Sequence, residues 1–302
     1  LCVLSIDRAR RQVYDLPPRC NKAPRNASIK ETPVPDKNRI LIAIPVFNEK
    51  KYVDHVLDKV LGLHDQLLLV DDGSTDGTAE MLSDRARARK DIRLIRHPEN
   101  RGYGQSLIDA FQWADCQRYD WVITMDCDEQ HEAERIPDFK RAIETGLWDV
   151  ISGSRYLQPR QDDDLPPTDR RSINTTITAI LNDLFHFNLT DSFCGFKAHR
   201  VSAMKRLKLD IPGYAFPLQF WPQVASKQLR LTEIPVRLIY NDPNRHFGGL
   251  LDDATNRLNH YLEVLSCEMN LLGEEDQVER LSAIIERKAP EAEVCVSCGC
   301  ED

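Results

Sequence analysis

Apolar runs and amphipathic segments alternate along the middle of the chain. Five runs, rich in β-branched residues, have the length and composition of buried strands: Ile40–Phe47, Leu67–Val70, Ile92–Ile95, Trp121–Met125 and Val150–Ile151. The segments between them carry apolar residues at helical spacing: Lys50–Leu61, Thr78–Arg89, Gln105–Cys116 and Glu132–Glu144. Buried strands separated by helices predict an α/β fold, in which an open, mostly parallel twisted sheet has helices on both faces.

The alternation changes after residue 155. Three Asp and two Pro residues between 162 and 167 predict an exposed loop. Beyond it we expect helices at Arg170–Phe185, Ser202–Leu207 and Leu250–Met269, and a strand near Leu229–Tyr240. The aromatic segment Tyr214–Pro222 has two interpretations: it packs in the core, which we favour, or it dips into a lipid interface.

Composition narrows the class of protein. The chain has 302 residues, of which 41% are hydrophobic and 29% are charged, as in soluble globular proteins. Its net charge of −8 argues against a general nucleic-acid binder. The longest uncharged run, Ile211–Ser226, is interrupted by three prolines, and no secretory signal pattern is visible. We therefore expect a cytoplasmic protein without a transmembrane helix.

Charge and cysteine are distributed unevenly towards the two ends. Residues 1–39 carry nine Lys or Arg against four Asp or Glu, which predicts a poorly ordered basic lead-in; contact of this arm with anionic lipid is the less favoured interpretation. Residues 273–302 carry nine acidic and three basic residues, which predicts a solvated helix and tail. The nine cysteines are odd in number and scattered, which favours reduced thiols. Cys295, Cys298 and Cys300 are spaced like metal ligands, but we favour an unstructured tail because no fourth ligand is near.

Polar signatures stand where three of the predicted strands end. The first strand is followed by Asn48 and Glu49, the second by residues 71–76, and the fourth by residues 126–131. Ligands bind beyond the carboxyl ends of the strands in an open parallel sheet, so we expect these carboxylates to meet at one edge. Like charges at such range require hydrogen bonds or a cation to compensate them.

Asp126 and Asp128 form a D-x-D element. Its hard oxygen ligands suit Mg²⁺ or Mn²⁺, which commonly takes further ligands from substrate phosphates. An acidic loop whose Asp residues cap a helix is the alternative, because D-x-D often arises by chance. The context favours the metal, since three strand ends carry such residues and the turn Asn100–Gly104 offers glycines for close approach to an anion. No P-loop element is present, and no G-x-G-x-x-G follows the first strand.

Five motifs occur in the order typical of family 2 glycosyltransferases, which the chain resembles over about residues 39–245. They are Ile44–Glu49, Val70–Asp76, Asn100–Gly102, Met125–Asp128 and Gly153–Tyr156. Within that family the chain is most similar to dolichol-phosphate mannosyltransferase and its bacterial polyprenyl-phosphate relatives. The resemblance implies a GT-A fold, a nucleotide-sugar donor, a divalent metal and inversion at the anomeric carbon. Together with the patterns above, it predicts a lead-in at 1–38, a catalytic domain at 39–248, and a helical extension with an acidic, Cys-containing tail at 249–302.

The resemblance also implies roles for individual residues. Those expected to bind the donor are Pro45, Phe47, Glu49, Asp72, Asp126, Cys127, Arg155, Arg170 and Lys197. Those expected to act in catalysis are Asp128, Arg155 and Asp191. Those expected to hold Mg²⁺ or Mn²⁺ are Asp126, Asp128 and Gln130. Arg171 is an alternative to Arg170, because the register is open across the Asp- and Pro-rich loop.

The expected chemistry explains these residue types. Cleavage of a sugar–phosphate bond leaves charge on a diphosphate, which a metal and Arg or Lys stabilise. A lipid phosphate acceptor arrives as an anion that paired arginines can hold, whereas a hydroxyl acceptor would make Asp191 the candidate base. The alternative interpretations are surface salt bridges for the arginines and a helix cap for Asp191.

Two further expectations concern the surroundings of the site. The polyprenyl-phosphate relatives often end in hydrophobic hairpins, whereas this chain ends in a charged tail, so we expect peripheral contact with a membrane. By position alone, Tyr240–Phe247 is predicted to be a mobile lid over the donor. The isolated histidines are interpreted as surface or packing residues; they are His55, His64, His97 and His199.

The sequence therefore predicts an inverting, metal-dependent enzyme that moves a hexose from GDP-mannose or UDP-glucose to a polyprenyl or dolichyl phosphate. Transfer to a hydroxyl acceptor is the alternative. A non-catalytic nucleotide-sugar-binding protein is the alternative of another class, which the intact D-x-D element weakens. The expected partners are a nucleotide sugar and a lipid phosphate, and no nucleic acid.

Overall fold

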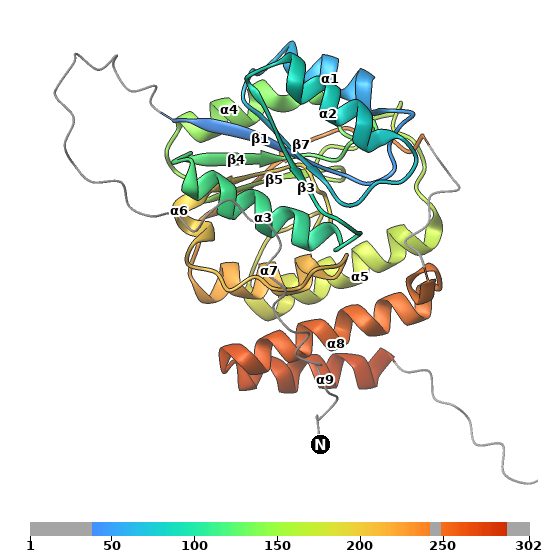
Figure 1. Cartoon of the computed structure of the whole chain (residues 1–302). Coiled ribbons are helices and arrows are strands. Elements are labelled where there is room, and N and C mark those ends of the chain that lie inside the picture. The colour runs from blue at the N-terminus through green and yellow to red at the C-terminus, as the bar shows by residue number, and fades with distance from the viewer. Residues whose placement is uncertain (1–37, 242–248, 289–302) are drawn as a thin grey trace, which may run out of the picture. The chain divides into compact units, whose positions relative to one another are not determined.

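A seven-stranded sheet forms the centre of the described part of the chain, which a computed structural model covers at residues 38–241 and 249–288 (Figure 1). Across the sheet the strands are β3 (Ile92–Arg96), β2 (Leu67–Asp71), β1 (Ile40–Val46), β4 (Trp121–Thr124), β6 (Lys197–Arg200), β5 (Val150–Ser154) and β7 (Leu231–Pro235). Neighbouring strands run parallel except at β6, which is antiparallel to β4 and to β5. The predicted α/β fold with a mostly parallel sheet is confirmed.

Helices cover both faces of this sheet, as predicted (Figure 1). Side chains alternate along β1, so that Leu41 and Ala43 belong to one half of the core and Ile42 and Ile44 to the other. The first half packs against α3 (Tyr103–Cys116), α5 (Thr168–Phe185) and α7 (Phe216–Ser226). The second half packs against α1 (Val53–Leu61), α2 (Thr78–Ala88) and α4 (Ile136–Glu144).

Two later helices, α8 (Ala254–Leu272) and α9 (Glu275–Lys288), follow the sheet in the chain, and α8 packs against α7 and α5. Glu268 of α8 is buried and accepts hydrogen bonds from the amide groups of Gln219 (3.1 Å) and Gln223 (2.8 Å) of α7. The carbonyl oxygens of the same glutamines accept backbone N–H groups of Asp210 and Lys208. This buried polar ladder ties α8 to the segment that precedes α7. Three short helical turns complete the elements: η1 (Ala133–Arg135), α6 (Val201–Met204) and η2 (Gly249–Asp252).

The aromatic segment at 214–222 belongs to the core, as favoured. Phe216, Phe220 and Trp221 are buried in α7, whereas Tyr214 remains 41% exposed. The other interpretation, in which these rings enter a lipid interface, is therefore wrong for the three buried ones. Within the residues described, no helix combines the length and the apolar character that crossing a membrane requires.

Some expectations differ from the structure or lie beyond it. The strand predicted near 229–240 is shorter, ending at Pro235, and the helix predicted from Leu250 begins as η2 and continues as α8. Strand β6 was not predicted at all. Residues 1–37 of the basic lead-in, residues 242–247 of the predicted lid, and Cys295, Cys298 and Cys300 lie outside the described residues.

Candidate active site

The loops that follow β1 and β2 are joined to each other by hydrogen bonds. The backbone N–H of Asn48 donates to Ser74 Oγ (3.0 Å), and the N–H of Thr75 donates to Asn48 Oδ1 (2.8 Å). Asn48 adopts a left-handed conformation (φ 56°), which asparagine tolerates better than most residues. Of the predicted nucleoside contacts here, Phe47 is 42% exposed at the tip of the strand, while Glu49 is buried. The motifs after β1 and β2 thus form one continuous edge.

Asp72 follows β2 and organises the turn between β3 and α3. Its Oδ1 accepts the backbone N–H of Arg101 (2.8 Å), and its Oδ2 accepts the N–H of Gly102 (2.8 Å). Burial alone would raise the pKa of Asp72, but these hydrogen bonds and one from His97 lower it. The side chain is buried, so its direct contact with a donor base or ribose stays a prediction.

His97, which the sequence analysis took for a surface or packing residue, bridges two buried carboxylates. Its Nδ1 lies 2.6 Å from Asp72 Oδ1 and its Nε2 lies 2.9 Å from Asp109 Oδ2. Burial alone would lower the pKa of His97, but the hydrogen bonds and charges of Asp109 and Asp72 raise it to about 9. The interpretation of His97 as a surface or packing residue is therefore wrong. It does hold for His199, which packs against the rings of Phe111 and Phe220.

Asp126 follows β4, and Tyr103 and Gly195 lie close to its carboxylate. A Cβ on Gly195 would come within 2.8 Å of Asp126 Oδ2 and 2.7 Å of the Tyr103 hydroxyl, so glycine is required there. Burial and the neighbouring Asp126 carboxylate raise the pKa of Tyr103 well above its ordinary value. Asp126 Oδ1 is buried without a hydrogen-bond partner among the described residues. An oxygen of this kind is available to a ligand.

Several polar groups in the rest of the D-x-D loop already form hydrogen bonds within the protein. Asp128 is buried; its Oδ1 accepts the backbone N–H of Gln130 (3.0 Å), and its carbonyl oxygen accepts Asn241 Nδ2 (2.9 Å). The side chain of Cys127 belongs to the core, so any contact of Cys127 with a donor has to come from its backbone. The Nε2 of Gln130 is buried without a described hydrogen-bond partner.

These groups fit a metal ion that brings ligands of its own. Among the described residues, no cluster of three or more His, Cys, Asp or Glu side chains is placed to hold a metal by itself. Mg²⁺ commonly uses one or two protein carboxylates and completes its shell with water and substrate phosphates. The unpartnered Asp126 oxygen, with Asp128 and Gln130 two and four residues further on, matches that smaller set.

Arg155 and Asp191 form a buried bidentate pair beyond the end of β5. Arg155 Nε lies 2.6 Å from Asp191 Oδ2, and Arg155 Nη2 lies 2.9 Å from Asp191 Oδ1. Asp191 is fully buried and also accepts Asn174 Nδ2 (2.8 Å) and the backbone N–H of Phe193 (3.2 Å). Burial alone would raise the pKa of Asp191, but Arg155 and Asn174 lower it to about 2. An enclosed carboxylate of such low basicity is poorly suited to act as the base that a hydroxyl acceptor would require, and it orients Arg155.

Of the two candidates for a second arginine, Arg171 shares the Tyr156 ring with Arg155. The guanidinium of Arg171 lies 3.5 Å from the centre of the Tyr156 ring, and that of Arg155 lies 5.6 Å from the same ring. Arg170 instead lies 5.5 Å from the centre of the Tyr240 ring. The buried ammonium of Lys197 donates to the Cys194 carbonyl and lies over Trp221, and its contact with the donor stays a prediction.

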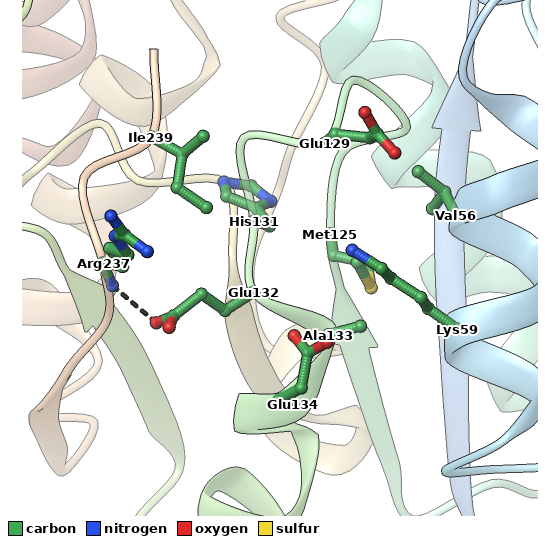
Figure 2. A pocket seen from close by; sticks show the side chains of 10 residues that line it. All are labelled: Val56, Lys59, Met125, Glu129, His131, Glu132, Ala133, Glu134, Arg237 and Ile239. Carbon is green, nitrogen blue, oxygen red and sulfur yellow. Dashed lines mark hydrogen bonds between the residues drawn. The ribbon is translucent and has the colours of Figure 1, made fainter. Parts of the chain in front are cut away.

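A cavity of about 300 Å³ lies beside the D-x-D loop, between α1 and the segment that follows β7 (Figure 2). Glu129 and His131 line it, but Asp72, Asp126 and Asp128 do not. His131 connects it to the loop, since its Nδ1 accepts the backbone N–H of Asp126 (2.9 Å) and its Nε2 lies 3.7 Å from Asp126 Oδ2. This cavity is therefore not the shared pocket expected for the three carboxylates. Asp72 and Asp126 are linked instead through the turn at Gly102 and Tyr103.

Carboxylates and arginines thus follow four strands of an α/β sheet at its carboxyl edge, which is where α/β enzymes with open parallel sheets bind their ligands. The sequence model of the family described as glycosyl transferase family 2 matches residues 41–208, more than half of the chain. The chain belongs to this family, and the protein is a glycosyltransferase.

Curated relatives cover most of the chain. It is 26% identical over 223 residues to an undecaprenyl-phosphate mannosyltransferase of Micrococcus luteus, covering 72% of this chain and 90% of the relative. It is 26% identical over 204 residues to a polyprenol monophosphomannose synthase of Mycolicibacterium smegmatis, covering 66% and 76%. An undecaprenyl-phosphate 4-deoxy-4-formamido-L-arabinose transferase of Proteus mirabilis is 34% identical over a shorter span, 54% of this chain and 49% of the relative.

Solved structures confirm the GT-A fold. Glucosyl-3-phosphoglycerate synthase from Mycobacterium tuberculosis, in complex with Mn²⁺, uridine diphosphate and phosphoglyceric acid, superposes with a TM-score of 0.56. The two proteins are 17% identical, and the match covers 78% of this chain and 79% of that one. At this identity the likeness concerns the fold.

Proposed function

We propose that the protein transfers a hexose, with inversion, from a nucleotide sugar to a polyprenyl or dolichyl phosphate. The observation that carries the proposal is the fixed guanidinium of Arg155, held by the fully buried Asp191, with the guanidinium of Arg171 over the same Tyr156 ring. Guanidinium groups bind phosphate oxygens in a fork geometry, so such a pair suits an acceptor that is already an anion. The names of the relatives from Micrococcus luteus and Mycolicibacterium smegmatis support the same acceptor class.

The acceptor phosphate in this proposal attacks without a general base. Its oxygen is ionised at neutral pH, so no proton has to be removed before the bond to the sugar forms. The low pKa of Asp191 agrees with this, because a carboxylate that titrates near 2 is a weak base at pH 7. Transfer to a hydroxyl would require another base, and this observation makes it the less favoured reaction.

The donor in this proposal lies along the edge formed by the loops after β1, β2 and β4. Phe47 offers an exposed ring, and Pro45, Glu49 and Asp72 shape the nucleoside side. Asp126, Asp128 and Gln130 would hold Mg²⁺ or Mn²⁺, which stabilises the charge on the departing diphosphate when bound. Mannose from GDP-mannose is the first donor to test, because the relatives from Micrococcus luteus and Mycolicibacterium smegmatis are named for mannose; glucose from UDP-glucose is the second.

A lipid acceptor also requires access to a membrane. We infer that the protein works as a peripheral protein at the cytoplasmic face. Flotation with vesicles that contain polyprenyl phosphate, compared with vesicles that lack it, tests this contact separately from catalysis.

The central experiment follows radiolabel from the donor. Full-length protein is incubated with GDP-[¹⁴C]mannose or UDP-[¹⁴C]glucose, Mn²⁺, and either polyprenyl phosphate or soluble glycans, and label is counted in organic and aqueous phases. We expect label in the organic phase, its loss on chelation of the metal, and its loss in Asp128→Ala. Arg155→Lys should reduce the rate strongly, because one ammonium cannot replace the fork. Label in soluble glycans alone would overturn the acceptor assignment, and unchanged turnover by Asp128→Ala would overturn the metal site.

A further inference from the structure

A buried charged bridge joins three segments that are distant in the sequence. Asp72 follows β2, His97 follows β3, and Asp109 lies within α3. His97 is 4% exposed, and each of its ring nitrogens lies within hydrogen-bond distance of one carboxylate. Because both nitrogens face acceptors, both carry a proton, and the ring is an imidazolium. Charges buried in this way have to be paired, and the bridge pairs them within the protein.

Asp109 is held from two further sides. Gln105 Nε2 donates to its Oδ1 (2.9 Å), and Arg101 Nη1 lies 3.3 Å from its Oδ2. The two carboxylates of the bridge therefore face two cations, His97 and Arg101. The charges balance within the cluster, so the cluster needs no ligand of its own.

The bridge contacts the turn at Arg101 and Gly102, which lies between the segment after β2 and the D-x-D loop after β4. Asp72 accepts the backbone N–H groups of Arg101 and Gly102, and a Cβ on Gly73 would come within 2.4 Å of the Glu99 backbone. The next residue, Tyr103, brings its hydroxyl to the Asp126 carboxylate. The position of this turn therefore determines how the segment after β2 lies relative to the D-x-D loop.

We propose that His97 is a positioning residue for the donor: by bridging Asp72 and Asp109 it holds the turn at Arg101 and Gly102, and through Tyr103 the carboxylate of Asp126. The inference rests on the proposed function, in which the donor binds along this edge. A bridge that served stability alone would leave nucleotide affinity unchanged once unfolding is accounted for. Partners that orient a binding group typically contribute about 10- to 100-fold to affinity or activity.

The test compares two buried histidines. His97→Ala removes the bridge, while His199→Ala removes a histidine of similar burial that packs between Phe111 and Phe220. The Kd of GDP and of UDP with Mn²⁺ is measured by calorimetry for each variant, at a temperature where thermal melting shows it to be folded. We expect the Kd for the nucleotide that wild type binds more tightly to rise about tenfold in His97→Ala and to stay within twofold in His199→Ala.

Steady-state kinetics and a milder variant complete the test. The donor KM of His97→Ala should rise more than its kcat falls, since saturating donor compensates for weakened binding. Asp109→Asn keeps the contact between His97 and Asp72 and should give a smaller change in the same direction, which preserves the test if His97→Ala does not fold. Equal Kd values in wild type, His97→Ala and Asp109→Asn would overturn this inference alone. A wild-type protein that binds neither nucleotide would instead overturn the proposed function.

Discussion

Replacing Asp191 by Asn removes the charge that holds Arg155 while keeping the size of the side chain. Asp191 accepts hydrogen bonds from Arg155, from Asn174 and from the backbone of Phe193, and it is fully buried. The amide of an asparagine would direct N–H groups at one of these donors. The variant would therefore leave the partly buried guanidinium of Arg155, whose side chain is 22% exposed, without its counter-charge.

The magnitude follows from the pKa of Asp191. A fall from 3.8 to about 2 corresponds to roughly 2 kcal/mol of stability, at ~1.36 kcal/mol for each pKa unit. This stability is present above pH 3.8 and is lost as the pH falls through 2, because the pKa is lower in the folded state. Removing one partner of a buried pair typically costs about 3–5 kcal/mol, since the other charge stays buried and unpaired. We expect Asp191→Asn to lose stability in that range at pH 7.

The same strand offers a matched control. Asp149 immediately precedes β5 and pairs with Arg230, which is 54% exposed, and with Arg200. Asp149 itself is 15% exposed and Arg200 26% exposed, so removing the Asp149 charge leaves arginines that still contact water, and the largely exposed contact with Arg230 typically contributes only about 0–1 kcal/mol. Asp149→Asn should therefore destabilise the protein much less and leave transferase activity unchanged.

Urea unfolding followed by circular dichroism measures both variants, and label transfer measures their activity under conditions where they are folded. We expect Asp191→Asn to lose both stability and kcat, because Arg155 is no longer fixed. If Asp191→Asn and Asp149→Asn lose equal stability, or if the folded Asp191→Asn variant keeps its kcat, Asp191 does not orient a functional arginine.

Two further predictions concern the donor edge. The pKa of His97 is raised from 6.5 to about 9, so its charge adds stability that is complete below pH 6.5 and is lost as the pH rises through 9. The difference in unfolding free energy between wild type and His97→Gln should therefore shrink by on the order of 3 kcal/mol from pH 6 to pH 9.5. A constant difference would contradict the charged bridge. Gly195→Ala should lower kcat/KM about a hundredfold in label-transfer assays, because its Cβ would displace the Asp126 carboxylate. Gly213→Ala is the control and should leave kcat/KM unchanged, because a Cβ at Gly213 meets nothing within 4 Å. Equal rates in the two variants would refute this reasoning.

Periodicity located the elements that are buried on both sides or amphipathic. The first five strands were expected within a few residues of their observed bounds, because each contains apolar residues and is flanked by turns. Strand β6 has the sequence Lys-Ala-His-Arg and carries no such pattern; it is a strand because it pairs with β4 on one side and β5 on the other. Helix α7 contains Pro222, which argues against a helix when the sequence is considered alone.

For the candidate site too, the sequence predicted some features and not others. Motif spacing brought Asp72, Asp126 and Arg155 to one edge, since the order of strands determines where their ends lie. It did not distinguish a carboxylate that faces a ligand from one that holds its own loop, because that depends on hydrogen bonds between distant segments. The bridge at His97 left one trace in the sequence: Asp109 stands among apolar residues of a helix, where a buried carboxylate requires a partner.

The ladder from Glu268 has a practical consequence for choosing fragments of this protein. The segment that defines the family ends at residue 208, yet the amides of Gln219 and Gln223 reach across to Glu268. A polypeptide cut after residue 208 would lose α7 together with both glutamines. One cut between α7 and α8 would keep α7 but leave both amides without their acceptor and expose the side of α7 that packs against α8. Boundaries for expression or crystallisation are therefore best placed beyond Leu272.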